Sequence, residues 1–328
     1  MRIGDIREAV TGDNLIDQMN TARDSRQAIA DGFLYEHTIV MMAADPGVGK
    51  STVSTQIAIE LSSGLPVLGL YPVPRPMKVL YIQTERPILE FLERAYVING
   101  KLPINKDMLV VTDEYKVLNL LNFEHVLILI DCIKRDCPDV DVIFVDPIYP
   151  MVSGGLSKDE PASAFTKALS LVQKETGALL YYNHHTSRPM HTSEGKKIEK
   201  DDPFYGSQWL KAHVTASYYM KEQELGVRML RKKDNYRLMP KEIVLDYDAE
   251  TELCHIPEAE LAPIDRLRAF VKHRELDKKQ FSFDEIQDET KLCTRTLRKL
   301  IVHSSLSDQF IVVSSIKNKN LYRIALAQ

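Results

Sequence analysis

The 328-residue chain has the composition of an ordinary folded protein, with 44% hydrophobic and 27% charged residues and a formal net charge of −4. This balance excludes a strongly basic chain, although it leaves room for a local basic patch. The sequence has neither the apolar core of a signal peptide nor a run long enough to span a membrane, and its four dispersed cysteines form no Cys-x-x-Cys pair. We therefore expect a cytoplasmic protein with reduced thiols and no membrane contact.

Apolar runs of buried-strand type alternate with helical patterns after a polar lead-in, residues 1–30, that we expect to link neighbouring subunits. Strands are expected at 37–44, 78–83, 108–112, 142–146 and 178–183, and helices at 53–64, 88–98, 125–135 and 163–177. Nearly continuous apolar strands separated by helices predict an α/β fold, a mostly parallel sheet with helices on both faces.

The pattern changes after Asp201. Four short strand patterns, from "VTASYYM" to "ELCHI", predict an antiparallel meander that completes a domain over residues 31–258. The tail from residue 262 holds 13 Lys and Arg against 8 Asp and Glu. Its helices (264–274, 283–289 and 294–303) and final hairpin (310–327) predict a small winged helix-turn-helix domain over residues 263–328.

The segment "AADPGVGKS" fits the phosphate-binding loop, with Ala44 in place of the usual first glycine. The glycines let backbone N–H groups approach a phosphate, and the following helix presents its N-terminus to the anion. Lys50 would neutralise the β- and γ-phosphate oxygens, and Ser51 would ligate Mg²⁺. ATP and Mg²⁺ are thus the expected cofactors. The candidate nucleotide-binding residues are Asp45, Pro46, Gly47, Val48, Gly49, Lys50, Ser51 and Thr52.

Two carboxylates follow other expected strands. Asp146 ends "VIFVD", where it would hold Mg²⁺ through water, and Glu85 follows "VLYIQT", where it could take a proton from the attacking water. The alternative for Glu85 is a solvated residue at the start of a helix. Because ligands of parallel sheets bind beyond the carboxyl ends of the strands, we expect both to share one rim with Lys50 and with His184–His185.

Residues of about 30–250 resemble the RecA/DnaB-type ATPases, and most of all the branch of plasmid RepA-type hexameric replicative helicases. The resemblance rests on the phosphate loop, "VLYIQTE", "VIFVDP", "NHHTS" and "YGSQWLKAH". It implies a RecA-like fold, Glu85 as catalytic base, and His185 as the residue that senses the γ-phosphate.

The resemblance also implies a homo-oligomeric ring in which basic residues of a neighbour complete each site. In "LRKKDNYRL" the trans-acting candidates are Lys233 first, then Lys232 and Arg237. The segment "YGSQWLKAHVTASYY" departs from the pattern because it holds no arginine. Either the arginine finger has moved to Arg231 or Arg237, or catalysis between subunits is weaker.

Three histidines lie close together at 184, 185 and 191. A zinc site is disfavoured because adjacent strand residues point to opposite sides and no further ligand has suitable spacing. We expect a structural role for His184, and for His185 a link between the nucleotide and the loop that begins at Thr186.

In the ring-forming family the loops at 151–163 and 186–206 would face a central channel that holds single-stranded DNA. The second loop carries Arg188, Lys196, Lys197 and Lys200, although acidic neighbours leave an ordinary solvated loop as the alternative. In the tail, the candidates are Arg295, Arg298 and Lys299 on a helix, with Lys317 and Lys319 at the hairpin tip. That domain could bind duplex DNA or a replication protein.

These features predict an ATP-hydrolysing, ring-forming DNA helicase or translocase for replication of a plasmid, phage or similar replicon. The alternative is an ATP-dependent switch that binds DNA or a partner without unwinding. A small-molecule phosphotransferase is a third and weaker possibility, because a kinase needs an acceptor site and usually a basic lid, whereas the resemblance favours hydrolysis.

Overall fold

The computed structural model describes most of the chain beyond residue 26. The described residues are 27–153, 155–156, 158–186, 190–191, 197–198, 208–223, 226–236, 239–248, 251, 253–257, 261, 263–274, 280–303, 310–316 and 319–324.

A nine-stranded mixed sheet forms the centre of the molecule, in the order β13-β12-β11-β10-β3-β7-β6-β4-β5. The six neighbouring strands from β10 to β5 run parallel. The strands are β3 (Ile39–Ala44), β4 (Val79–Gln83), β5 (Leu109–Thr112), β6 (Val142–Asp146), β7 (Leu179–His185), β10 (Ala216–Gln223), β11 (Gly226–Asp234), β12 (Glu242–Asp248) and β13 (Leu253–His255).

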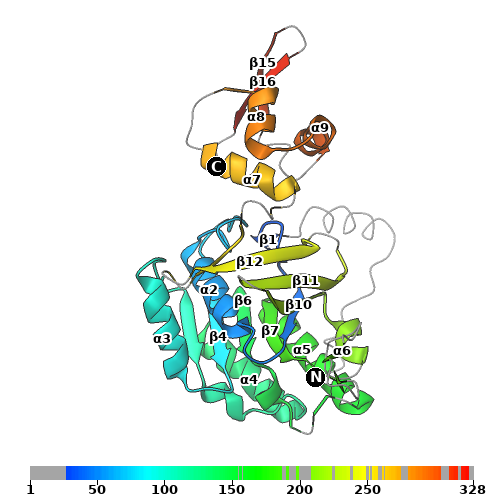
Figure 1. Cartoon of the computed structure of the whole chain (residues 1–328). Helices are drawn as coiled ribbons and strands as arrows, with labels where there is room; N and C mark the ends of the chain where they lie inside the picture. Colours follow the sequence, from blue (N-terminus) through cyan, green and yellow to red (C-terminus); the bar gives the residue numbers. More distant parts are fainter. Residues whose placement is uncertain are drawn as a thin grey trace, which may run out of the picture.

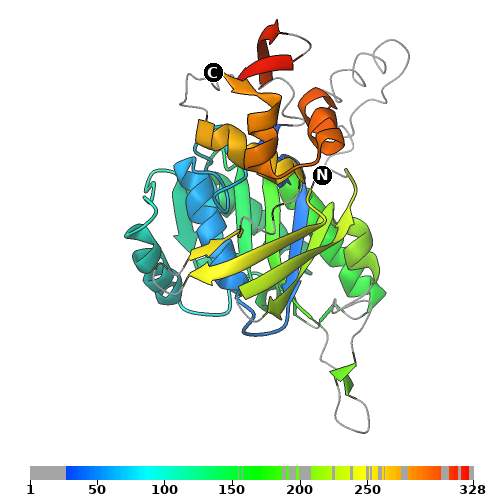
Figure 2. The ribbon, with the colours of Figure 1, turned by 45° about the horizontal axis from the view of Figure 1, so that its top comes forward.

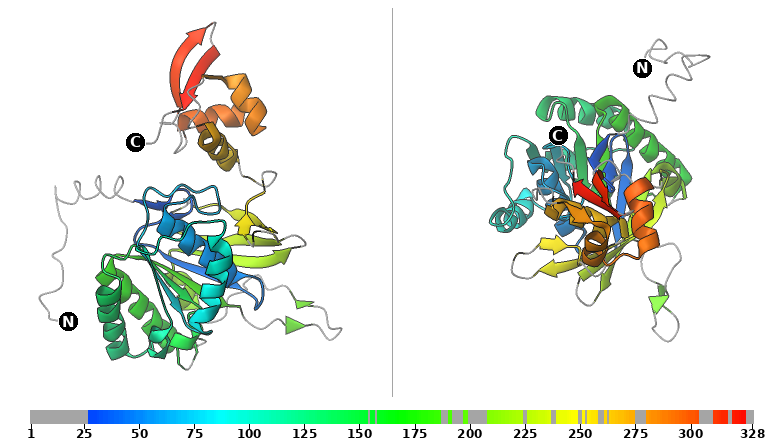
Figure 3. Two further views of the ribbon diagram at one scale, coloured as in Figure 1. Left: turned by 90° about the vertical axis from the view of Figure 1, so that its left-hand side faces the viewer. Right: turned by 90° about the horizontal axis from the view of Figure 1, so that it is seen from above.

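Helices cover both faces of the parallel part, which explains why its central strands are apolar throughout (Figure 3). Along β3, Val40 and Met42 join the core with α2 and α3, whereas Ile39 and Met41 join the core with α4 and α5. The α/β prediction with helices on both faces is confirmed. These helices are α2 (Lys50–Ser63), α3 (Ile88–Asn99), α4 (Phe123–Asp136) and α5 (Asp159–Thr176).

Local sequence fixes the helix ends. Gly49 has a left-handed φ of 100° directly before α2, and Gly64 ends the same helix with a φ of 68°. The Asn122 side chain caps α4 by accepting a hydrogen bond from the Glu124 backbone N–H at 2.9 Å.

The predicted meander is confirmed, and it continues the main sheet (Figure 2). Its first strand, β10, runs parallel to β3, with Ala216 opposite Val40. The meander thus lies beside the strand that leads into the phosphate loop. The sequence did not predict this strand pairing.

Shorter elements surround the sheet. β1 pairs antiparallel with β2, so residues 28–30 of the expected lead-in belong to the folded unit, while residues 1–26 lie outside the described residues. These elements are β1 (Ala28–Ala30), β2 (Leu34–Tyr35), η2 (Glu114–Val117), η3 (Tyr149–Met151), β8 (Met190–His191), β9 (Lys197–Ile198) and α6 (Gln208–His213).

The C-terminal part has the expected elements: three helices and a hairpin around a separate small core that includes Phe270, Ile286 and Leu297 (Figure 1). A capping box between Ser282 and Glu285 begins its second helix. The elements are α7 (Pro263–Arg274), β14 (Phe281–Ser282), α8 (Phe283–Thr290), α9 (Thr294–His303), β15 (Phe310–Ile316) and β16 (Lys319–Ile324).

Arg268 of α7 anchors this part to the turn between β1 and β2. Its buried guanidinium lies 3.0 Å from Asp265 and 3.6 Å from Asp31. It packs so closely on Gly32 that a Cβ there would lie 2.3 Å from the guanidinium. Gly32 suits this junction because its φ of +81° is a left-handed conformation that L side chains rarely adopt.

Candidate functional site

Four of the predicted site residues lie at one rim of the parallel sheet. In register, Ala44 at the end of β3 pairs with His185 at the end of β7, and Gln83 at the end of β4 pairs with Asp146 at the end of β6. In the chain, Lys50 comes after β3 and Glu85 comes after β4. The structure thus brings together Lys50, Glu85, Asp146 and His185, and the charges of the other three act on His185.

Lys50 is enclosed by its own loop. Its ammonium donates to the carbonyl oxygens of Ala44 at 2.8 Å and Asp45 at 3.2 Å. Burial lowers the pKa of Lys50, an effect that the nearby Asp146, Asp45 and Glu85 oppose. The loop therefore holds a cation beside the N-terminus of α2, where an anion is favoured.

Asp146 is almost fully buried and accepts two strong hydrogen bonds, from Tyr81 Oη at 2.6 Å and Asn183 Nδ2 at 2.7 Å. Asn183 also bonds Ser54 of α2, so β4, β7 and α2 together fix the carboxylate at the end of β6. Burial, together with the Asp146 charge, raises the pKa of Tyr81 well above its ordinary value, which keeps it a donor.

The roles of Tyr81 and Ser54 were missed in the sequence analysis. The sequence did hold a signal for Tyr81. Its hydroxyl lies inside the apolar strand "VLYIQ", and a buried hydroxyl needs a hydrogen-bond partner.

The residues at this rim fit a hydrated Mg²⁺. Among the described residues, the Gln83 side-chain carbonyl oxygen has no hydrogen-bond partner, although Gln83 is 2% exposed and pairs with Asp146 across the sheet. Leaving such an acceptor unsatisfied costs about 1–3 kcal/mol. Mg²⁺ prefers oxygen ligands and keeps several waters. Ser51 would hold the ion directly, and Asp146, with Gln83 beside it, would hold its waters.

Glu85 and His185 face each other across the rim. His185 Nε2 lies 4.0 Å from Glu85 Oε2, and the Glu85 side chain is 54% exposed. Burial and the Lys50 charge lower the pKa of His185, against the opposing effect of Glu85 and Asp146. The lowered pKa favours the neutral imidazole, which can donate one hydrogen bond. Thr84 fixes the start of the segment that carries Glu85. Its N–H donates to the Asp146 carbonyl oxygen at 3.0 Å, and its hydroxyl donates to the Pro147 carbonyl oxygen.

A direct hydrogen bond joins the phosphate loop to the segment after β7. The Thr186 hydroxyl donates to the Asp45 carboxylate. The first residue of the expected basic loop is thus tied to the first residue of the nucleotide-binding segment.

The AAA-domain family model matches residues 7–190, more than half of the 328 residues, and includes the phosphate loop and all four rim residues. The chain belongs to this family. It is a P-loop ATPase with a RecA-like α/β fold. No curated protein matches the chain.

None of the described helices of the ATPase is both long and apolar enough to cross a membrane, and all four cysteines are free. The described residues contain no group of three or more His, Cys, Asp or Glu placed to hold a metal ion. The side chain of His191 lies outside the described residues.

His184 lies inside the ATPase and its ring Nδ1 is 2.7 Å from the His185 carbonyl. Burial lowers the pKa of His184 from 6.5 to about 4. The unfolded chain takes up this proton near pH 6.5 and the folded protein only near pH 4, so the unfolded state binds more protons between these values. The free energy of unfolding should therefore fall as the pH is lowered through this window.

We expect the free energy of unfolding of the wild type, measured with urea, to fall by about 2 kcal/mol between pH 7.5 and pH 5 because of His184. This fall should be missing from His184→Gln. The comparison is made between pH values within each variant, so a uniform destabilisation by the substitution does not matter. An equal loss in His184→Gln would place the acid sensitivity elsewhere.

The trans-acting candidates differ in their surroundings. Lys233 donates to the carbonyl oxygens of Lys211 and Ala212 at the end of α6, at 2.7 Å each. Arg231 bonds Asp234 at 2.8 Å and the Met239 carbonyl, whereas Lys232 is exposed. Arg237 lies outside the described residues. Lys233 thus already caps a helix within its own chain.

The DNA-contact candidates are only partly described. Arg295, Arg298 and Lys299 are exposed on α9, and the Arg298 guanidinium lies 5.7 Å from the centre of the Phe283 ring. Lys197 and Lys319 lie in β9 and β16, but their side chains are outside the described residues, as are Arg188, Lys196, Lys200 and Lys317 altogether.

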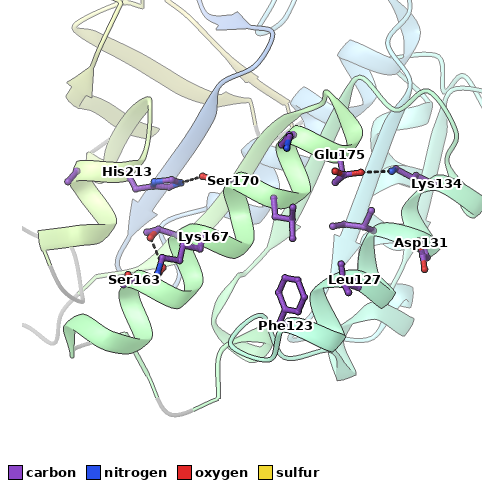
Figure 4. A pocket seen from close by; sticks show the side chains of 14 residues that line it. Phe123, Leu127, Asp131, Lys134, Ser163, Lys167, Ser170, Glu175 and His213 are labelled. Carbon is purple, nitrogen blue, oxygen red and sulfur yellow. Dashed lines mark hydrogen bonds and ion pairs between the residues drawn. The ribbon is translucent and has the colours of Figure 1, made fainter. Parts of the chain in front are cut away.

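Two cavities of the ATPase differ in their relation to the rim. The larger, about 910 Å³, lies on the outer side of α4, α5 and α6, where Phe123 and Leu127 face Ser163 and Lys167 (Figure 4). It contains no rim residue. The smaller, about 540 Å³, is lined by Gly47, Val48, Gly49 and Thr52 of the phosphate loop.

Proposed function

We propose that this ATPase is a ring-forming DNA helicase or translocase of the plasmid RepA-type branch, serving replication of a plasmid, phage or similar replicon. The observation that carries the proposal is the shared rim. A phosphate loop, two carboxylates and a histidine meet there, and both strand-end segments expected to reach DNA, at 151–163 and 186–206, start beside it.

The rim supplies the groups for hydrolysis of ATP. Glu85 takes a proton from a water whose oxygen attacks the γ-phosphorus. The bond between that phosphorus and the β–γ bridging oxygen breaks, and ADP leaves with the bond's electron pair. Lys50 exchanges its carbonyl partners for phosphate oxygens. Mg²⁺, when bound, neutralises charge on the phosphates.

Two features support contact with DNA. α9 exposes three cations on the second helix of an expected helix-turn-helix, and β15–β16 would be its wing. The segment after Thr186 holds four further cations that could follow a strand's phosphates in the channel of a ring. A replication protein is the other partner that the C-terminal part could take.

The proposal is tested by ATP turnover with and without single-stranded DNA. We expect DNA to raise turnover at least several-fold, with a loss of stimulation at high salt because phosphate contacts release counterions. Turnover that DNA leaves unchanged at every salt concentration would contradict a DNA motor.

One observation favours the second candidate, an ATP-dependent switch without unwinding. Lys233, the first choice for a residue acting on a neighbour's site, is bonded within its own chain. Mass measurement with nucleotide and DNA separates the two: a closed oligomer supports the motor, and a monomer supports the switch.

His185→Ala should retain ATP binding and lose the stimulation of turnover by DNA. The reason is that the His185 side chain lies near Glu85, and that the next residue in the chain, Thr186, is the first of the basic segment. Turnover is measured with and without DNA, and exposed His255 provides a matched His→Ala control. Normal stimulation in His185→Ala would refute the role.

A further inference from the structure

The one-turn helix η3 presents an aromatic ring at the rim, next to the side chain of His185. The rings of Tyr149 and His185 meet edge to face, with their centres 6.4 Å apart and their planes at 75°. Contacts of this geometry between aromatic rings are favourable beyond the area that they bury. Tyr149 is 46% exposed, so its ring lies at the surface of the rim while one edge of the pair is closed to water.

The backbone that carries this ring is held in place on both sides. Ile148 and Met151, which flank Tyr149 and the next residue, are fully buried in the core with α4 and α5. The Ile148 N–H donates to the Asn183 carbonyl oxygen at 2.9 Å, and the Met151 carbonyl oxygen accepts from the Leu120 N–H at 2.8 Å. The place of the tyrosine beside β7 is therefore set before a ligand binds.

The imidazole of His185 has little else to fix it. Among the residues that the structure describes, its ring nitrogens take part in no hydrogen bond, and Nε2 lies 4.0 Å from Glu85 Oε2. Its side chain is 32% exposed. An imidazole with so few contacts can change rotamer, yet it can donate to a γ-phosphate only in a suitable orientation. The Tyr149 ring is the contact that limits this rotation.

The same contact joins the two strand-end segments. Tyr149 lies two residues before the segment at 151–163, and His185 comes directly before the segment at 186–206. The strands that precede them, β6 and β7, are neighbours in the sheet. We propose that Tyr149 is a positioning residue, whose ring holds the His185 imidazole toward Glu85 and the nucleotide and ties the two segments together at the rim. It acts through His185 and not on the substrate.

This inference rests on the proposed role of His185, and one readout of its experiment needs neither ATP nor DNA. NMR of ¹⁵N-labelled histidine gives the pKa of His185, whose signal is assigned by its loss in His185→Ala. The charges of Lys50, Glu85 and Asp146 also act on this imidazole and stay in every variant. Because burial lowers the pKa of His185, we expect Tyr149→Ala to raise it toward 6.5 and Tyr149→Phe to leave it unchanged.

ATP affinity and turnover are measured on the same variants with and without single-stranded DNA. We expect Tyr149→Ala to retain ATP binding and to reduce DNA-stimulated turnover about two- to tenfold, the range for loss of one aromatic pair. Tyr149→Phe keeps the ring and should keep the stimulation. In the His185→Ala background, Tyr149→Ala should add nothing, because one residue acts through the other. Tyr96→Ala, at an 82% exposed position of α3, is the matched control.

An unchanged pKa of His185 in Tyr149→Ala would overturn the positioning role. Wild-type DNA stimulation in Tyr149→Ala, or a loss that adds to that of His185→Ala, would overturn it as well. An equal loss in Tyr149→Phe would assign the effect to the hydroxyl and also contradict the ring contact. A wild type that DNA does not stimulate would instead contradict the proposed motor, and the pKa comparison would still decide whether Tyr149 holds the imidazole.

Discussion

Lys50→Ala is expected to abolish ATP hydrolysis, with a fall in turnover of at least about 10²–10³-fold, while the fold remains intact. The ammonium lies in the phosphate loop, at hydrogen-bond distance from the carbonyl oxygens of Ala44 and Asp45. Removing it takes away the cation that would stabilise charge on the transferring phosphate. Because burying a charge is itself unfavourable and the ammonium bonds only backbone carbonyl oxygens in the structure, we expect its loss to leave the protein folded.

Phosphate release and thermal unfolding are measured on the same preparations of Lys50→Ala, the wild type and Lys101→Ala. Lys101 is exposed just after α3 and is the matched lysine control. Unchanged turnover in Lys50→Ala would remove the phosphate loop from the chemistry. If Lys50→Ala is unfolded, its inactivity says nothing of the role of Lys50. The measurement is then made on Lys50→Met, which keeps the aliphatic stem of the side chain.

Glu85→Gln is expected to keep ATP binding and to lose about 10²–10⁴-fold in turnover. The amide has the shape of the carboxylate but cannot take the proton of the attacking water. The Glu85 side chain is more than half exposed, so the substitution disturbs little packing. Single-turnover hydrolysis and ATP affinity together separate the loss of the base from a loss of binding.

Glu93→Gln, at an exposed position of α3, is the matched control and should behave as the wild type. Full turnover in Glu85→Gln would assign proton transfer to another group. A loss of ATP affinity equal to the loss of turnover would give Glu85 a binding role instead.

The parallel sheet and its rim were predictable because each depends on local pattern. Apolar strands separated by helices require a sheet buried on both faces, and the carboxyl ends of neighbouring parallel strands must lie together. Lys50, Glu85, Asp146 and His185 each follow or end such a strand, so their meeting followed from topology without side-chain detail.

The hydrogen bonds that hold the rim residues in place were harder to predict from the sequence. The grip of Tyr81 and Asn183 on Asp146 depends on the register of three strands, and the bond from Thr186 to Asp45 joins segments 141 residues apart. Lys233 resembled a residue that reaches a neighbour, yet it caps α6 because β11 lies beside that helix. The cavity beside the phosphate loop depends on β10 pairing with β3, which no local pattern reveals.

The most direct test of the motor is displacement of a labelled strand from a forked DNA duplex, with ATP and Mg²⁺ present and with Lys50→Ala as the inactive control. The rim, the Thr186–Asp45 bond and the exposed cations of α9 predict strand displacement that requires ATP and is lost in Lys50→Ala. Wild-type protein that hydrolyses ATP but separates neither forked nor tailed duplexes would contradict the helicase and leave the ATP-dependent switch.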